Sequence, residues 1–226
     1  MKIVTILAQS TLYTLLFLFL PCKGMSLTPQ LHNRPSIVIA FDLHEVLMKI
    51  DFKQLFRTAL YALATSPRNT FKIAYNYLRD REFDLTQQTA RNIFNSQYPI
   101  AETWNIASEL TAEGFPLFLF SNIEAQTFTE LKQRYPARFS LFQGFHTVHC
   151  KEQQKPALSA FLSFEEFLKS FGYIRPIIIF VDDNPANIDI ARKIGWYPIH
   201  YKNSKQLANA LEQTLSSLVQ RPAVLY

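Results

Sequence analysis

The sequence predicts an α/β protein with a mainly parallel sheet, and three observations lead to this prediction. Short uncharged runs rich in Ile, Val, Leu and Phe recur along the chain, as expected for strands buried on both faces. Segments with helical periodicity separate these runs, and such alternation folds into a Rossmann-like parallel sheet with helices on both faces. Hydrophobic residues make up 48% of the chain and charged residues 18%, which indicates a globular protein rather than a disordered one.

Five segments are predicted to form the strands. Residues 36–41 read Ser-Ile-Val-Ile-Ala-Phe, a β-branched run without charge, and are expected to form the first buried strand. The other strands are expected at residues 115–120, 144–149, 176–181 and 196–201. The pattern is weakest at residues 144–149.

Helices are predicted between the strands. Residues 101–113 are expected to end at Gly114 and residues 158–171 at Gly172, because glycine readily closes a helix. The remaining predicted helices are residues 125–134, which stop near Pro136, residues 186–194, which close at Gly195, and a last helix that Ser204 caps, with Leu207, Leu211, Leu215 and Leu218 on one side.

The core is expected to comprise residues 36–50 and 100–226, and a small helical cap is expected at residues 51–99. Three stretches of the inserted segment have helical character, at residues 52–64, 70–79 and 86–94. Residues 25–35 are polar and contain two prolines, which is typical of a linker.

The first 24 residues are mostly apolar, and three interpretations stay open. A signal peptide is favoured because residues 12–20 have the length of its apolar region and cleavage could follow Gly24. A membrane anchor through residues 3–21 is the second interpretation. Either of these predicts an exported or membrane-anchored protein, with membrane association through residues 3–21. A translation start at Met25 would instead predict a cytoplasmic one.

Polar residues stand directly after four of the predicted strands. In parallel α/β sheets, ligands bind at the carboxyl ends of the strands, so these residues are expected to meet at one edge. They are Asp42 after the first strand, Ser121 and Asn122 after the second, Lys155 past the third, and Asp182 and Asp183 after the fourth.

This set of side chains suits phosphoryl transfer. A carboxylate such as Asp42 can attack phosphorus and form a covalent acyl phosphate. Because carboxylate and phosphate are both negative, a hard dication held by Asp42, Asp182 and Asp183 is expected, and oxygen ligands favour Mg²⁺. Lys155 would neutralise a further phosphate oxygen, and Ser121 would donate a hydrogen bond.

At these residues the chain resembles the haloacid dehalogenase (HAD) superfamily. The family's first motif is matched by residues 42–46 (Asp-Leu-His-Glu-Val), its second by Ser121, and its third by Lys155-Pro156. The fourth match, at residues 180–188, is the most specific one. The first and fourth motifs are similar to the sugar-phosphate phosphatase branch, which includes glucose-1-phosphate phosphatases and carries a small helical cap after the first motif.

The resemblance implies a magnesium-dependent hydrolase of small phosphomonoesters, with sugar phosphates as candidate substrates. The expected partner is a small phosphorylated metabolite rather than nucleic acid, because the net charge of +5 includes no dense basic run. The resemblance assigns catalysis to Asp42, His44 and Lys155, substrate binding to Ser121, Asn122 and Lys155, and magnesium binding to Asp42, Asp182, Asp183 and the backbone carbonyl of His44.

One position departs from the family pattern. The family has a second aspartate there as its general acid, whereas this chain has His44, followed by Glu45 in place of the usual glycine. Imidazole transfers protons near neutral pH, so His44 could replace the aspartate, with Glu45 as a surrogate. The alternative is a catalytically impaired binding or regulatory protein that keeps the fold. A carbon–halogen hydrolase is a further rival, and the pair Asp182 and Asp183 argues against it.

Overall fold

The computed structural model describes residues 36–51, 96–147 and 153–219, with five single positions between 53 and 64. The chain divides into two units, one of residues 36–208 and one that joins residues 1–35 to 209–226. The predicted N-terminal segment 1–24, the linker 25–35 and most of the predicted cap lie outside the described residues.

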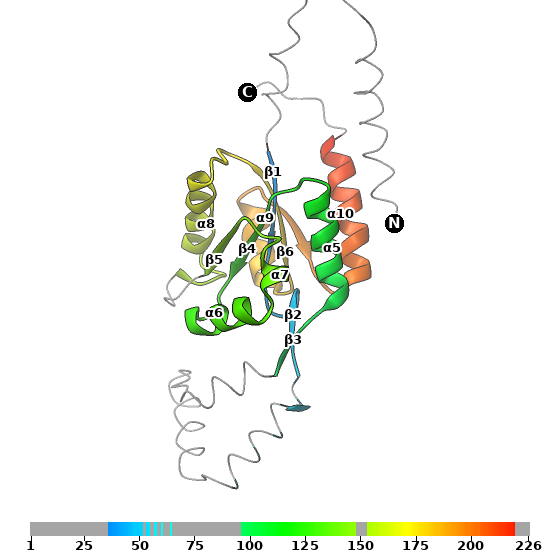
Figure 1. The fold of residues 1–226 in the computed structure, drawn as a ribbon. Helices are drawn as coiled ribbons and strands as arrows, with labels where there is room; N and C mark the ends of the chain where they lie inside the picture. Colours follow the sequence, from blue (N-terminus) through cyan, green and yellow to red (C-terminus); the bar gives the residue numbers. More distant parts are fainter. Residues whose placement is uncertain are drawn as a thin grey trace, which may run out of the picture. The chain divides into compact units, whose positions relative to one another are not determined.

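A sheet of five parallel strands forms the centre of the larger unit (Figure 1). In sheet order the strands are β5 (Gly144–Thr147), β4 (Leu117–Ser121), β1 (Ile37–Phe41), β6 (Ile177–Asp182) and β7 (Tyr197–His200). The central strand β1 pairs with β4 on one side and with β6 on the other, all in parallel. The predicted α/β fold with a parallel sheet is confirmed, and all five predicted strands form.

The helices between the strands also follow the prediction. They are α5 (Ala101–Ala112), α6 (Ala125–Arg134), α8 (Leu158–Ser170), α9 (Pro185–Lys193) and α10 (Ser204–Val219). A short helix α7 (Pro136–Phe139) was not predicted. Four residues are too few to show a helical period, and Pro136, expected to stop α6, occupies the first turn of α7, where proline is tolerated.

One face of the sheet packs against α8 and α9. Alternate residues of the strands point to this face, because side chains of a strand alternate between its two sides. Phe120 of β4 stacks on Phe164 of α8 with ring centroids 4.7 Å apart, and its ring lies 5.3 Å from that of Phe161. Together with Phe118, Phe180 and Trp196, these rings form one buried cluster, which holds five of the chain's 20 phenylalanines.

The opposite face of the sheet packs against α5 and the residues after α7. Phe41 of β1 lies 6.1 Å from Phe142, edge to face, and Trp104 of α5 lies 5.8 Å from the same ring. The Trp104 Nε1–H donates to the Leu47 carbonyl oxygen at 2.8 Å, which ties α5 to the loop after β1. Helices therefore cover both faces, as the alternation of strand and helix predicts.

A second, two-stranded sheet was not predicted. The strands β2 (Met48–Ile50) and β3 (Gln97–Pro99) pair in antiparallel fashion, with Lys49 opposite Tyr98. Residues 97–99, expected to end the cap, therefore belong to this pair. The two strands bring the ends of the inserted segment together, because the Asp51 amide donates to the Ser96 carbonyl oxygen at 2.8 Å. For the rest of the predicted cap at residues 51–99, that is residues 52–95, the helical cap stays a prediction.

The prediction that the chain is exported or membrane-anchored is corrected, because the described residues give no positive sign of it. Within residues 36–51, 96–147 and 153–219, no helix has both the length and the apolar character needed to cross a bilayer. The segment at residues 3–21, on which the expected export and membrane association rested, lies outside the described residues.

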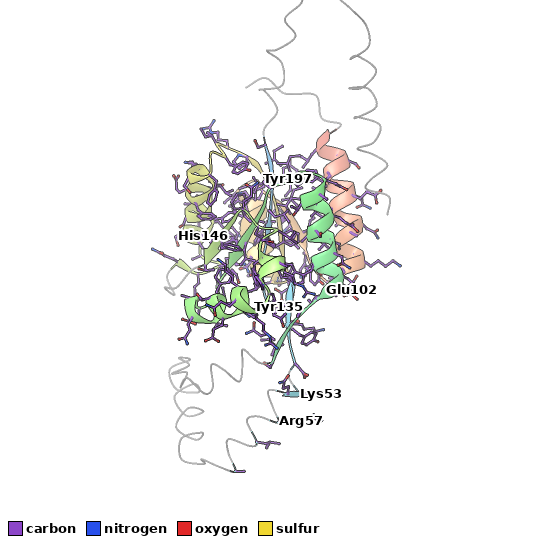
Figure 2. All side chains as sticks on the ribbon, in the orientation of Figure 1. Lys53, Arg57, Glu102, Tyr135, His146 and Tyr197 are labelled. Carbon is purple, nitrogen blue, oxygen red and sulfur yellow. The ribbon has the colours of Figure 1, made fainter. Side chains whose placement is uncertain are left out.

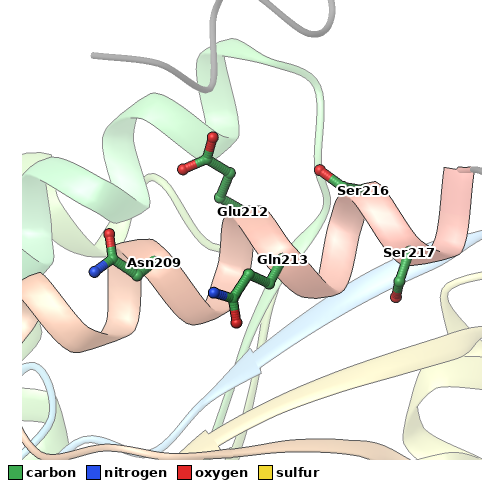
Figure 3. Close-up of a pocket in the computed structure, with 5 residues that line it drawn as sticks. All are labelled: Asn209, Glu212, Gln213, Ser216 and Ser217. Atoms are coloured by element: carbon green, nitrogen blue, oxygen red, sulfur yellow. The ribbon is translucent and has the colours of Figure 1, made fainter.

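The described part of the smaller unit is the end of α10, at residues 209–219. Five side chains of this segment line an open depression of about 530 Å³, shown in Figure 3. They are Asn209, Glu212, Gln213, Ser216 and Ser217. A single carboxylate among four neutral groups offers neither the clustered charge of a metal site nor the cations of a phosphate site.

His146 of β5, labelled in Figure 2, provides a test of the aromatic packing between the sheet and α8. Its ring centroid lies 5.5 Å from that of Phe120 and 5.2 Å from that of Phe167, and its Nε2 is buried without a hydrogen-bond partner among the described residues. Burial lowers the pKa of His146 below its usual value of 6.5. At a pH just below 6.5, His146 is therefore protonated more often in the unfolded chain than in the folded one.

We expect the free energy of unfolding to decrease as the pH falls below 6.5, because the unfolded chain then binds more protons than the folded one. In His146→Phe this contribution should vanish, so the stability of the variant should depend less on pH between roughly 5 and 6.5. Urea denaturation over this pH range measures both. Identical pH slopes in the two proteins would contradict the burial of a neutral imidazole.

Candidate active site

The carboxyl ends of β1, β4 and β6 meet at one edge of the sheet. Asp42 follows β1 directly, Ser121 ends β4, and Asp182 ends β6. The three strands are neighbours in the sheet. The Asp42 amide donates to the Val181 carbonyl oxygen at 2.9 Å, which fixes the end of β1 against the end of β6. The structure therefore brings together the strand ends that the sequence singled out.

Lys155 lies at the centre of this group. Its Nζ is 3.0 Å from Asp42 Oδ1 and 2.7 Å from Asp182 Oδ2, and it donates a third hydrogen bond, at 2.7 Å, to the Phe120 carbonyl oxygen. These bonds use all three donors of an ammonium group. Only 1% of the Lys155 side chain is exposed, so its charge is fixed between two carboxylates in a region from which water is excluded.

Asn122 holds the backbone of Lys155. Its Oδ1 accepts from the Lys155 amide at 2.9 Å, and its Nδ2 donates to the Lys155 carbonyl oxygen at 2.8 Å. Both ends of the Asn122 amide are thus engaged by one residue, which places Lys155 over the strand tips. The predicted contact of Asn122 with substrate stays a prediction.

Asp182 is fully buried and accepts several hydrogen bonds. Its Oδ1 accepts from the Asn184 amide at 2.8 Å, and Asn187 Nδ2 lies 2.9 Å from Oδ1 and 3.0 Å from Oδ2. Burial raises the pKa of Asp182, and the nearby Lys155 ammonium opposes that rise. Asn187 therefore orients the carboxylate from the first turn of α9.

Asp183 completes a cluster of three carboxylates. One oxygen each of Asp42, Asp182 and Asp183 lies within 4.8 Å of the other two. Burial raises the pKa of Asp183, and the negative charges of Asp42 and Asp182 raise it further. Lys155 alone cannot balance three carboxylates, and hard oxygen donors at this spacing fit a dication such as Mg²⁺. The cluster therefore passes the chemical test for a magnesium site.

His44 contacts a residue that the sequence did not single out. Its Nε2 lies 3.2 Å from Oε1 of Gln97, the first residue of β3. Gln97 is almost completely buried. It falls in the segment predicted as cap, and its position beside His44 depends on the pairing of β2 with β3, which no local pattern indicated.

Glu45 adopts a backbone conformation that favours glycine. Its φ angle is +58°, in the left-handed region where a side chain costs about 1 kcal/mol or more. The family that the chain resembles usually has glycine at this position, and the positive φ of this turn explains that preference. The Glu45 carboxylate also helps to raise the pKa of Asp183, so it lies close to the acidic cluster.

Glu45→Gly should raise the free energy of unfolding by about 0.5–1 kcal/mol, because the relieved strain exceeds the entropy cost of glycine. Chemical denaturation measures the change. The matched control is Glu130→Gly within α6, where glycine should destabilise by a similar amount. Destabilisation by both changes would contradict strain at Glu45.

A cavity of about 550 Å³ opens beside the acidic cluster. Asp183 of the cluster and the nearby Glu45 line it on one side, and Lys49 and Tyr98 line it from the β2–β3 pair. Residues 202–204, at the start of α10, also line it. The cavity is large enough for the organic part of a small ligand whose reacting group lies at the carboxylates.

Comparison with known proteins agrees with this architecture. No family model matches the chain. The sequence is 28% identical to the sesquiterpene phosphatase astK of Aspergillus oryzae over 114 residues, which are 50% of this chain and 55% of that protein. The match therefore spans about half the length of this curated relative.

Solved structures of HAD-family proteins share the fold. An enzyme from Bacteroides thetaiotaomicron, solved in complex with magnesium and inorganic phosphate, superposes with a TM-score of 0.55 at 14% identity, covering 75% of this chain and 95% of that one. A predicted HAD-like hydrolase from Porphyromonas gingivalis superposes with a TM-score of 0.52 at 18% identity, covering 83% and 99%. The protein therefore has the fold of the haloacid dehalogenase-like hydrolases.

Proposed function

We propose that the protein is a magnesium-dependent phosphatase that hydrolyses small phosphomonoesters through an aspartyl phosphate on Asp42. The observation that carries this proposal is the convergence of Asp42, Lys155, Asp182 and Asp183 at the carboxyl edge of the sheet. The phosphatase name of the curated relative and the magnesium and phosphate bound to a structural neighbour support it.

Asp42 is the proposed nucleophile because it combines access with a fixed orientation. Its Oδ1 is held by Lys155, and 13% of its side chain is exposed, whereas Asp182 is fully buried. The second carboxylate oxygen can therefore attack phosphorus, forming the acyl phosphate as the bond to the leaving-group oxygen breaks. Lys155 and the Ser121 hydroxyl are proposed to neutralise and hydrogen-bond the phosphate oxygens.

The proposed magnesium ligands are Asp42, Asp182, Asp183 and the backbone carbonyl of His44. When bound, the ion would supply the positive charge that lets a phosphate dianion approach the Asp42 carboxylate. Asn187 and Lys155 keep the Asp182 carboxylate in place for this purpose.

His44 is proposed to carry the proton in both halves of the reaction. In the first half it gives a proton to the leaving-group oxygen. In the second half it takes a proton from the water that attacks the acyl phosphate, and so returns to its starting state. Glu45, which lines the same cavity, is the candidate for this proton transfer if the imidazole is removed.

The proposed substrate class is a small organic phosphate ester whose leaving group occupies the cavity beside Asp183. The resemblance at the first and fourth motifs favours sugar phosphates. The name of the curated relative adds phosphate esters of terpene alcohols to the candidates.

The test is an assay of the purified full-length chain with a generic aryl phosphate, a sugar-phosphate panel and farnesyl phosphate, with magnesium and with a chelator. We expect turnover that requires magnesium and that falls at least about 100-fold in His44→Ala, the usual cost of removing an acid–base group. Turnover that continues in the chelator would contradict the proposed metal site.

The aspartate-to-histidine change at His44 favours a second candidate, a binding or regulatory protein without turnover. This candidate predicts that inorganic phosphate or a phosphate ester binds in a magnesium-dependent manner, while no ester is hydrolysed. Isothermal titration calorimetry, run beside the turnover assay on the same preparation, distinguishes the two candidates: binding with turnover supports the phosphatase, and binding without turnover supports the second candidate.

A further inference from the structure

We propose that Gln97 is a positioning residue that fixes the tautomer and the orientation of the His44 ring, so that Nδ1 is the atom that exchanges protons. This inference deepens the proposed function and rests on it for its catalytic consequence. Its structural part concerns a single contact between two described residues and can be tested without substrate.

The contact joins a partly exposed ring to a buried amide. His44 Nε2 lies 3.2 Å from Gln97 Oε1, which is within hydrogen-bond distance. Gln97 is only 2% exposed, so water cannot easily replace this contact. A buried amide oxygen that lost its partner would cost free energy, and the contact is therefore expected to persist in solution.

An amide oxygen accepts hydrogen bonds and cannot donate them. The Nε2 atom of His44 must therefore carry the hydrogen of this bond. In a neutral imidazole only one nitrogen is protonated, so the lone pair remains on Nδ1. The reaction therefore starts from the imidazolium, in which both nitrogens carry hydrogen, and Nδ1 gives its proton to the leaving group. The neutral ring that results keeps the hydrogen on Nε2, and its Nδ1 lone pair then takes a proton from water.

The backbone around Gln97 is well fixed. Gln97 lies opposite Ile50 in the β2–β3 pair, and hydrogen bonds close both ends of that pair, from the Asp51 amide to the Ser96 carbonyl oxygen at 2.8 Å and from the Ile100 amide to the Leu47 carbonyl oxygen at 2.9 Å. His44 itself forms a β-bridge with Met48, the first residue of β2. The ring and the amide are therefore held by one small element, a rigid support of the kind that orients catalytic groups.

The pair also closes the two ends of the inserted segment 52–95. Gln97 is the point where the chain returns from that segment to the core. A family aspartate needs no choice of tautomer, whereas a histidine in its place does. Gln97 supplies the constraint that this substitution requires.

The first experiment measures the tautomer directly. Long-range ¹H–¹⁵N correlation spectra of the full-length chain with ¹⁵N-labelled histidine, recorded without magnesium or substrate, distinguish Nε2–H from Nδ1–H rings. The chain has five histidines, and His44→Ala identifies the signal of His44. We expect the Nε2–H form in the unmodified protein and a shift toward a mixture in Gln97→Met, which keeps the size of the side chain and removes the acceptor.

Two further variants separate positioning from a loss of structure. Gln97→Glu keeps an acceptor and should keep the Nε2–H form, and Gln97→Asn, shorter by one methylene, should lose it. The matched control is Gln133→Leu on the exposed side of α6, which should leave the His44 signal unchanged. A Nδ1–H ring in the unmodified protein would overturn the proposal, and so would an Nε2–H form that persists unchanged in Gln97→Met and Gln97→Asn.

The kinetic arm measures the consequence for catalysis. We expect Gln97→Met to lower kcat about 10-fold with KM changed less than about twofold, because the ring would transfer protons less often while substrate contacts remain. Gln97→Glu should recover most of the loss. An unchanged kcat in Gln97→Met would overturn the catalytic part. If the unmodified chain hydrolyses none of the phosphates, the proposed function fails, and the tautomer spectra still decide whether Gln97 positions His44.

Discussion

Asp42→Asn is expected to lower kcat by about 10⁴-fold or more on any phosphomonoester that the protein hydrolyses, because it removes the proposed nucleophile from a group of residues that act together. An amide nitrogen or oxygen is a far weaker nucleophile than a carboxylate. The loss should appear in kcat rather than in KM, since Lys155 and Ser121 would still hold phosphate. Steady-state kinetics with magnesium in excess measures the change.

The matched control for this prediction is Asp189→Asn. Asp189 is an exposed carboxylate on α9 that pairs with Arg192 at 2.9 Å on the same helix. Its replacement should leave kcat unchanged and should alter stability by less than about 1 kcal/mol. Residual turnover of a tenth or more in Asp42→Asn would mean that another residue, or water directly, attacks phosphorus.

Lys155→Met is expected to have the largest effect on stability. The change removes the partner of two carboxylates, Asp42 and Asp182, and leaves the Phe120 carbonyl oxygen without its donor. Removing one member of a buried ion pair costs about 3–5 kcal/mol, because the charges left behind are poorly solvated. For a chain of this size, that cost corresponds to a decrease in Tm of roughly 10 °C. Calorimetry of the magnesium-free protein measures it.

Two further variants show whether the loss of stability in Lys155→Met comes from its buried ion pairs. Lys169→Met removes an exposed lysine that pairs with Glu166 within α8, and it should cost less than about 1 kcal/mol. Adding Asp182→Asn to Lys155→Met should restore part of the lost stability, because it removes one of the two carboxylates that have lost their cationic partner. Equal effects of Lys155→Met and Lys169→Met would contradict a buried Lys155 between two charged carboxylates.

The arrangement of the core could be predicted from the sequence because its signals are local. Short uncharged runs rich in β-branched residues, such as residues 36–41, favour strands buried on both faces, and Gly114, Gly172 and Gly195 close helices at positive φ. The β2–β3 pair could not be predicted in the same way. Each of its strands has three residues, and they are separated by more than 40 residues of sequence, so no local period connects them.

In the candidate site, too, the features with local sequence signals could be predicted and the contacts between distant residues could not. Asp42, Ser121 and Asp182 stand at the ends of predicted strands, and a parallel sheet brings such ends together, so their proximity followed from the fold. The contacts of Asn122 with Lys155, of Asn187 with Asp182 and of Gln97 with His44 depend on side-chain directions across the site. Asn122 stands in a loop, Asn187 in the first turn of α9 and Gln97 in a short strand, and the sequence offered no signal that these three residues support the charged ones.

The most direct test of the proposed mechanism is to trap the acyl phosphate. The full-length chain is mixed with magnesium and a phosphomonoester that it hydrolyses, and the reaction is quenched in acid. Borohydride then reduces an aspartyl phosphate to homoserine. Peptide mass spectrometry then locates the modified residue. The proposed mechanism predicts homoserine at position 42 and at no other aspartate, and none in Asp42→Asn. Turnover without any modification of Asp42, or modification of Asp182 or Asp183 instead, would contradict it.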